Sequence, residues 1–137
     1  MKYLLAILLA GILTLSPVKA EAGVISSTTM QNQIAIARYT HGKPFLVPNK
    51  TLKAQSKTRV IKMAKSGKLQ HLPGLKMGKF RCIGENVGVG PSSKKIQKAF
   101  MKSPGHRRNI LDRHYHKIGL TTYKYHGRVW VVQLFAC

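Results

Sequence analysis

The sequence predicts an α+β protein, a three-layer α-β-α sandwich with a central antiparallel sheet. Residues Arg128 to Phe135 are apolar on both faces of an expected strand, and such a strand lies between two layers. His126-Gly127 supplies a two-residue turn that joins this strand to another at Ile118 to Tyr125. The segments before this hairpin carry helical patterns, so we expect helices on both faces of the sheet.

The first twenty residues predict a secretory signal peptide. Met1-Lys2-Tyr3 is a short basic start, Leu4 to Leu15 is mostly apolar, and small residues surround the expected cleavage site. We expect cleavage after Ala20, or else after Ala22. A membrane-spanning helix needs about 20 apolar residues, which this run does not reach. The protein is therefore predicted to be secreted or periplasmic, with residues 21–137 forming one domain.

Two helices are predicted next along the chain. One runs from about Thr28 to Tyr39, after several Ser and Thr residues that suit an N-cap. The other runs from about Lys50 to Ser66, with Asn49 as N-cap and Gly67 as C-terminal stop. Residues of one stripe of the second helix recur at helical spacing, namely Leu52, Ser56, Val60 and Met63. Lysines fall on its opposite side, as a solvated face or as part of a docking patch for anions: Lys50, Lys57 and Lys65.

The remaining elements are shorter. Phe45 to Val47 is expected to pack as an extended piece between the two helices. Phe80 to Val89 has a strand pattern interrupted by glycines, which indicates a bulge or a close backbone approach. A third helix is expected from Lys94 to Lys102, and Ser103-Pro104 begins a short fourth one. The inner side of the third helix is predicted to consist of Ile96, Ala99 and Phe100.

The chain is strongly basic, with 24 Lys and Arg, 3 acidic residues and a net charge of +21. Two of these cations and none of the acids lie in the first twenty residues, so the mature domain would keep +19. Such a charge attracts anionic polymers and membrane surfaces. We expect partners such as lipopolysaccharide, anionic lipid, teichoic-type polymers or nucleic acid.

Cys82 and Cys137 are the two cysteines. In an oxidising compartment one disulfide between them is the simplest interpretation. The alternative is two unpaired thiols. Neither cysteine has a second Cys or His at the spacing of a zinc motif, so the pair alone does not predict a metal site.

Three ionisable residues could converge in this layout. His71 follows the second helix, Glu85 lies on the expected strand, and His106 lies at the start of the short helix. Two imidazoles and a carboxylate are suited to proton transfer, and they also match the donor set of a catalytic zinc site. Each histidine taken alone is more often structural or exposed to solvent.

A series of short motifs lies along the whole mature chain: Ala37-Arg38, Pro44 to Val47, Leu69-Gln70-His71, Gly84-Glu85-Asn86-Val87, Ser103 to Leu111, Ile118-Gly119-Leu120 and Trp130 to Phe135. Their order resembles that of a bacterial member of the CAP superfamily, the SCP-like domain of cysteine-rich secretory proteins, antigen 5 and plant pathogenesis-related proteins. The resemblance implies an α-β-α sandwich with a shallow cleft lined by His and Glu.

In this family some relatives bind zinc or another divalent ion in that cleft, so the resemblance makes His71, Glu85 and His106 the expected cleft residues and metal ligands. The fuller family pattern has two His and two Glu, and the second Glu is missing here. Residues 90–110 contain no acid. Arg38 and Asn86 also match family positions, and we expect them to be structural, with Arg38 held against a carbonyl or Glu85.

Three functions compete at this point. The first is a secreted, non-enzymatic binding module for a lipid, glycan or peptide at an anionic cell envelope. The second is a hydrolase in which Glu85 and a histidine activate water, although the sequence lacks a nucleophile motif and a second carboxylate. The third is a cationic protein that binds the envelope or nucleic acid, although the aromatic and basic interleaving of single-strand binders is missing. We favour the binding module.

Overall fold

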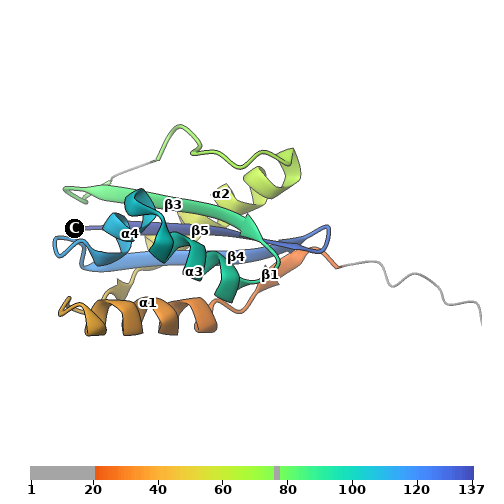
Figure 1. Cartoon of the computed structure of the whole chain (residues 1–137). Helices are drawn as coiled ribbons and strands as arrows, with labels where there is room; N and C mark the ends of the chain where they lie inside the picture. The colour runs from red at the N-terminus through yellow and green to blue at the C-terminus, as the bar shows by residue number, and fades with distance from the viewer. Residues whose placement is uncertain (1–20, 76–77) are drawn as a thin grey trace, which may run out of the picture.

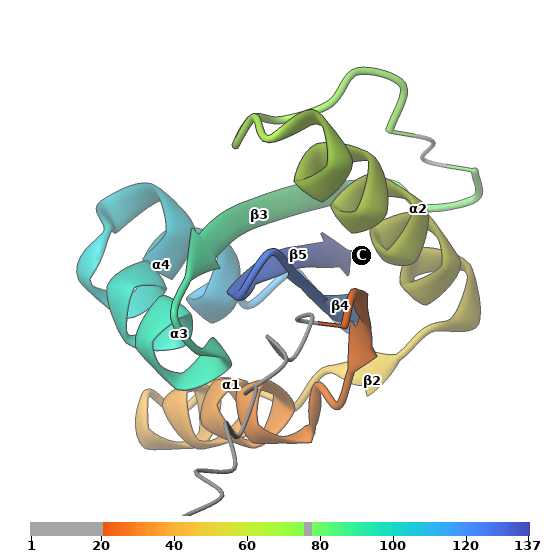
Figure 2. The same ribbon diagram turned by 90° about the vertical axis from the view of Figure 1, so that its right-hand side faces the viewer.

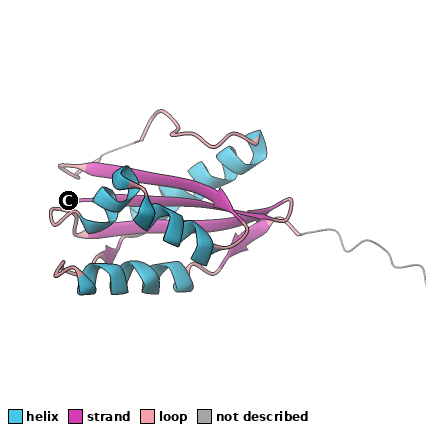
Figure 3. Cartoon of the chain, viewed as in Figure 1, coloured by secondary structure: helices cyan, strands magenta, loops and turns pink. Residues whose placement is uncertain are grey.

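A mixed sheet between helical layers forms the body of the protein (Figure 1). The computed structural model describes residues 21–75 and 78–137, so the predicted signal peptide lies outside the described residues. The elements follow the order β1 (Gly23–Ile25), α1 (Thr28–Thr40), β2 (Val47–Pro48), α2 (Lys50–Ser66), β3 (Ile83–Gly90), α3 (Ser93–Lys102), α4 (Pro104–Leu111), β4 (Lys117–Tyr125) and β5 (Arg128–Ala136) (Figure 3).

The three predicted layers are confirmed (Figure 2). Helix α2 covers one face of the sheet, where Leu52 and Val60 pack with Trp130 and Leu134. Helices α1, α3 and α4 cover the other face of the sheet. On that face, β5 contributes Val129, Val131 and Phe135 to the core. Side chains of β5 therefore alternate between two cores, as expected for a strand that is apolar on both sides.

The sheet has the strand order β1-β4-β5-β3, and β2 pairs with β4 beside this path. All pairings are antiparallel except the two-residue pairing of β2 with β4, which is parallel. The predicted turn between β4 and β5 is confirmed, since His126 and Gly127 have φ angles of 47° and 72°. Positive φ at both central residues defines a type I′ turn, which matches the twist of the two strands.

One local prediction held in part and another was wrong. Val47 is extended, as part of β2, but Phe45 and Val47 do not pack on the core, because each is 62% exposed, and Leu46 between them contacts it. Ala99 is exposed on α3, whereas Gln97 is buried there because it hydrogen-bonds to Gln133 in the sheet. Strand β1 was not predicted.

The stripe predicted on α2 is confirmed, since all four of its residues are fully buried. This helix approaches β4 closely at Gly119, where an added Cβ would overlap the backbone carbonyl carbon of Leu52. The predicted disulfide is also present and joins Cys82, just before β3, to Cys137, just after β5. In the part of the chain that the structure describes, no helix has the length and apolar character needed to cross a membrane.

Candidate functional site

Glu85 lies on β3 and is held by a cation that the sequence analysis did not select. Its side chain is 6% exposed. The Nε of Arg59 donates to Glu85 Oε2 at 2.5 Å, and Nη2 donates to Oε1 at 3.1 Å. This two-point geometry matches the planar guanidinium to the carboxylate. Glu85 is thus one half of a buried ion pair.

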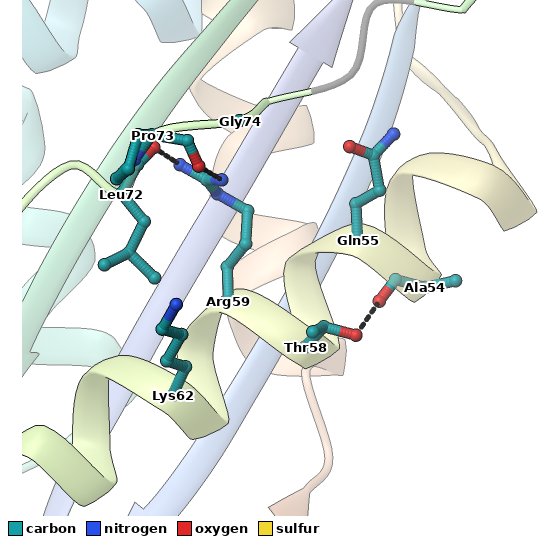
Figure 4. A pocket seen from close by; sticks show the side chains of 8 residues that line it. All are labelled: Ala54, Gln55, Thr58, Arg59, Lys62, Leu72, Pro73 and Gly74. Atoms are coloured by element: carbon teal, nitrogen blue, oxygen red, sulfur yellow. Dashed lines mark hydrogen bonds between the residues drawn. The ribbon is translucent and has the colours of Figure 1, made fainter.

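Arg59 reaches this position from α2. It also donates to the backbone carbonyls of Leu72 and Pro73, in the loop that follows the helix (Figure 4). Arg59 therefore connects α2, β3 and the loop. A sequence signal for it existed, because Arg59 stands seven residues after Leu52 and so falls on the same buried stripe.

His71 is brought to Glu85, as predicted. Its Nδ1 lies 2.8 Å from Glu85 Oε1, so the imidazole donates to the carboxylate. The His71 side chain is 64% exposed, in contrast to its partner. A ring held in this way has one nitrogen fixed by the carboxylate, and the other nitrogen is left for a ligand or a proton.

Within residues 21–75 and 78–137, His106 has no side-chain bond to this pair, although it lies near enough for the charge of His71 to act on it. Its ring lies 2.8 Å from Ser103 Oγ and stacks on Phe100 with centroids 4.6 Å apart. Burial lowers the pKa of His106, and the charge of His71 lowers it further. The environment of His106 therefore disfavours the charged form of its imidazole.

A buried amide network lies beneath the site. Asn86 donates to the carbonyl of His106 at 3.1 Å and to the side-chain oxygen of Gln133 at 3.0 Å. Asn109 of α4 donates to Asn86 Oδ1 and to the carbonyl of Glu85. These bonds fix the start of α4 against β3, so Asn86 sets the position of His106 relative to Glu85.

Arg38 occupies another buried position, away from Glu85. It is fully buried and donates to backbone carbonyls only, namely those of Pro44, Ile110, Asp112 and Tyr115. Of the two expected arrangements, the structure therefore has the carbonyl contacts. Burial lowers the pKa of Arg38, and the charge of Asp112 raises it.

Among the described residues, Asp112 pairs with its neighbour His114 and not with the nearby Arg107 or Arg108. Asp112 Oδ1 instead accepts hydrogen bonds from the backbone N–H of His114 at 2.8 Å and from its Nδ1 at 2.9 Å. A carboxylate binds the backbone two residues on more readily than a flexible arginine, because less conformational entropy is lost. The hydrogen bond from the backbone of His114 is the largest cause of the lowered pKa of Asp112.

A divalent ion does not fit this arrangement of donors. Both oxygens of Glu85 are bonded to Arg59, and one also accepts from His71. The guanidinium places a positive charge where a metal would need to approach. Among the described residues, no group of three or more His, Cys, Asp and Glu could hold a metal ion. Zinc binding by His71, Glu85 and His106 stays a prediction, and it requires Arg59 to leave.

A hollow of about 370 Å³ lies between α2 and the loop that follows it, with Arg59 in its lining (Figure 4). Its walls are mostly apolar, with Arg59 and Lys62 as the charged members. The residues that line it are Ala54, Gln55, Thr58, Arg59, Lys62, Leu72, Pro73 and Gly74. Arg59 therefore lines this hollow and also binds Glu85.

Solved structures share this fold. An outer surface protein from Borrelia burgdorferi is similar with a TM-score of 0.75 at 19% identity, covering 86% of this chain and 98% of that one. An extracellular protein containing an SCP domain from Bacillus anthracis is similar with a TM-score of 0.68 at 20% identity, covering 80% of this chain and 39% of that one. Venom allergen-like protein 4 from Schistosoma mansoni has a TM-score of 0.68 at 17% identity, covering 82% and 89%.

The sequence itself also matches a family model. No curated protein sequence matches this one significantly. The model of the cysteine-rich secretory protein family, CAP, matches residues 31–135. This range extends from α1 to β5 and includes the cleft residues, so the chain belongs to the cysteine-rich secretory protein family, as its motifs predicted.

Proposed function

We propose that this protein is a secreted, non-enzymatic binding module that attaches to the anionic polymers or surfaces of a cell envelope and takes a lipid, glycan or peptide as ligand. The observation that carries the proposal is the excess of exposed cations over acidic residues. Glu85 is buried and bonded to Arg59, and Asp112 is bonded to His114 and is only partly exposed. The exposed lysines therefore face few negative charges on the protein.

Lysines are exposed on both helical layers. Those of α2 include Lys50, Lys57 and Lys65, and those of α3 include Lys94 and Lys98. A cationic surface of this kind raises the local concentration of polyanions and speeds their association. The names of two structural relatives, an outer surface protein and an extracellular protein, support a location outside the cytoplasm.

The state of Glu85 favours binding over catalysis. A general base needs a carboxylate that is free to accept a proton from water or substrate. Both oxygens of Glu85 accept from Arg59, and this pair is buried. We therefore infer that Glu85 organises the cleft and does not perform chemistry there.

The test of envelope binding uses the purified mature protein and immobilised lipopolysaccharide, teichoic-type polymer and duplex DNA. Attachment is measured against salt concentration, beside a variant in which Lys50, Lys57 and Lys65 are changed to Gln. We expect the affinity for the envelope polymers to fall steeply with salt and to drop in the variant. Equal binding of wild type and variant at all salt concentrations would contradict the proposal. Tighter binding to DNA than to either envelope polymer would favour the nucleic-acid alternative.

A hydrolase is the second candidate, and the His71–Glu85 pair favours it. An exposed imidazole held by a buried carboxylate is arranged as a base with its orienting partner. In that case His71→Ala would abolish turnover of cell-wall or peptide substrates, whereas the exposed His126→Ala would not. Under the binding proposal, wild type and both variants show the same background turnover.

A further inference from the structure

The outer side of α1 and the segment after it expose an unusual amount of apolar surface. Ile36 is 63% exposed, Tyr39 73%, and Phe45 and Val47 62% each. We refer to these four residues as the apolar face. They are four of the six large hydrophobic side chains that are exposed in the described part of the chain. Exposed apolar side chains gathered on one face, unlike scattered ones, indicate an interaction site.

Three residues of the apolar face, Ile36, Tyr39 and Phe45, form one continuous surface. The rings of Tyr39 and Phe45 stack with their centroids 6.4 Å apart and their planes within 8°. A hollow of about 360 Å³ lies between Ile36, Tyr39 and Phe45, with Asn32 and Ala35 completing its lining. Figure 2 shows α1 at the lower margin of the molecule, with no other labelled element beyond it.

The face is also held rigidly. On the opposite side of α1, Met30, Ile34 and Arg38 are buried. Arg38 ties the helix to the carbonyl of Pro44, which directly precedes Phe45. The same guanidinium bonds to the carbonyls of Ile110 and Tyr115. Exposure of the apolar face therefore does not result from a loosely attached helix.

The charge around the face is positive. Lys43 lies between Tyr39 and Phe45 in sequence, and Lys50 follows β2. Arg107 of α4 reaches His41 at the end of α1, with 3.1 Å between their nitrogen atoms. No acidic residue occurs anywhere between Glu21 and Glu85. The apolar face is thus bordered by cations and has no acid on its own elements.

Exposed apolar side chains bordered by cations favour one kind of partner for this face. A second copy of the chain would bring the same cations against this border, and each copy carries a net charge of +19 without the predicted signal peptide. An anionic bilayer supplies the opposite charge in its headgroups and an apolar layer beneath them. Tyr, Phe and Ile beside Lys are the residue types that enter the headgroup boundary of a membrane.

We propose that the apolar face docks into the headgroup region of an anionic lipid bilayer. Ile36, Tyr39 and Phe45 enter the boundary between headgroups and acyl chains, while Lys43 and Arg107 contact the lipid phosphates. The inference rests on the proposed attachment to an anionic envelope and assigns one surface and one lipid partner to it. Attachment to other polyanions uses the remaining cationic surface.

The experiment measures partition of the folded protein onto vesicles that mix phosphatidylglycerol with phosphatidylcholine. The test variant is Ile36→Ser with Phe45→Ser, which leaves every charge in place. The matched control is Val24→Ser with Leu69→Ser, because these side chains are 50% and 49% exposed but lie outside the apolar face. We expect the test variant to partition about tenfold more weakly than wild type, and the control to stay within about twofold of wild type.

Insertion is measured separately with a single probe. Phe45→Trp should show a shift of emission to shorter wavelength and quenching by brominated lipid, and Val24→Trp should show neither. The native Trp130 is 5% exposed and gives a constant background in both proteins.

The outcomes separate the two proposals. Equal partition of wild type and test variant, with attachment to a soluble polyanion retained in both, would overturn docking through the apolar face and leave envelope attachment standing. Self-association of the wild type that the test variant abolishes would also overturn it, because a second copy would then be the occupant. If the wild type binds neither vesicles nor the soluble polyanion, both proposals fail.

Discussion

Arg59 neutralises the charge of Glu85 and occupies both of its carboxylate oxygens. Seen in the sequence, Glu85 is a rare acid in a basic chain between two histidines. In the structure its charge is neutralised from within the protein, by a guanidinium that also bonds to the loop carrying His71. The cleft thus contains its own cation, and the shape of the loop depends on the same side chain.

The first prediction concerns this ion pair. Arg59→Met should lower the free energy of unfolding by about 3 kcal/mol, because it leaves a buried carboxylate without a counter-charge. The side chains of Arg59 and Glu85 are 9% and 6% exposed, so solvent screens the pair only weakly. Urea unfolding monitored by circular dichroism measures the change.

Two controls accompany it. Lys57→Met removes one exposed cation from the same helix and should change stability by less than about 0.5 kcal/mol. Adding Glu85→Gln to Arg59→Met should restore part of the loss, because the unpaired charge is then removed. If Glu85→Gln instead lowers the free energy of unfolding of Arg59→Met further, the unpaired carboxylate is not the cause of the lost stability.

The second prediction concerns zinc. Because Arg59 neutralises Glu85 and blocks its oxygens, zinc should leave the thermal unfolding midpoint of the wild type unchanged. Arg59→Met frees the carboxylate beside His71 and removes the repelling charge, so zinc should raise its midpoint. Arg59→Met with His71→Ala is the matched control and should lose this increase. A midpoint for the wild type that rises with zinc would show that a metal binds while Arg59 is in place.

The third prediction concerns pH. The pKa of His106 is lowered from 6.5 in the folded protein, first by burial and then by His71. Below pH 6.5 the unfolded chain binds a proton at this position before the folded protein does, so the free energy of unfolding falls as the pH decreases. The fall stops once the pH is below the pKa of His106 in the folded state.

Urea unfolding at pH values between about 5 and 8, the range in which such a histidine titrates, measures how the free energy of unfolding changes with pH. His106→Gln should make the slope shallower, since the titrating group is gone. NMR titration of the His106 ring provides a direct value. A midpoint at or above the ordinary value of 6.5 would contradict the prediction.

Residue types and motif order predicted part of this site and missed the rest for a physical reason. His71 and Glu85 are found together as expected, and Arg38 binds carbonyls as one of two expected arrangements. Arg59 was missed because a basic residue on a lysine-rich helix is usually solvated, and only its place on the buried stripe marks it. Its partner, Glu85, lies 26 residues further on, and no local rule connects them.

At the scale of elements, the sequence predicted the helices and strands whose ends are determined by nearby residues. Helix α2 has the predicted bounds because Asn49 caps it through Leu52 N–H and Gly67 ends it with φ of 67°. The β4–β5 hairpin follows from a turn that accepts positive φ at two residues. Strand β1 was missed because three residues carry too little pattern, and its partners, Thr122 to Lys124, lie about a hundred residues away.

The fourth prediction tests the contact between α2 and β4. Gly119→Ala should lower the free energy of unfolding by about 3 kcal/mol or more, because the new methyl group would overlap the Leu52 backbone. That neighbour is helix backbone, which cannot rotate away as a side chain could. Thermal unfolding measures the loss. Gly105→Ala in α4 is the control, because an added Cβ there meets nothing within 4 Å, and helix propensity favours it by about 1 kcal/mol.

At the scale of the whole molecule, the disulfide joins the start of β3 to the end of β5 and closes a loop that contains α3, α4 and β4. Cys82 and Cys137 are 55 residues apart in sequence and also share a backbone hydrogen bond of 3.1 Å. The fifth prediction is that replacing both cysteines by Ser lowers the free energy of unfolding by about 4 kcal/mol, since the unfolded chain gains the entropy of the opened loop. Urea unfolding of the variant, beside the reduced wild type, measures it. A loss below about 1 kcal/mol would mean that the unfolded chain keeps these ends together without the bond.

The central place of β5 has a consequence for how the protein is made. Strand β5 pairs with β3 on one side and with β4 on the other, although it follows both in the sequence. A chain that leaves a ribosome or a translocation pore amino end first presents α2 and β3 long before the strand on which they pack. Both cores contain side chains of β5, so neither core is complete until this last strand has emerged, and the apolar stripe of α2 lacks its β5 partners until then. During the proposed export, a chain that emerges amino end first would therefore complete its folding only after its last strand has left the translocation pore.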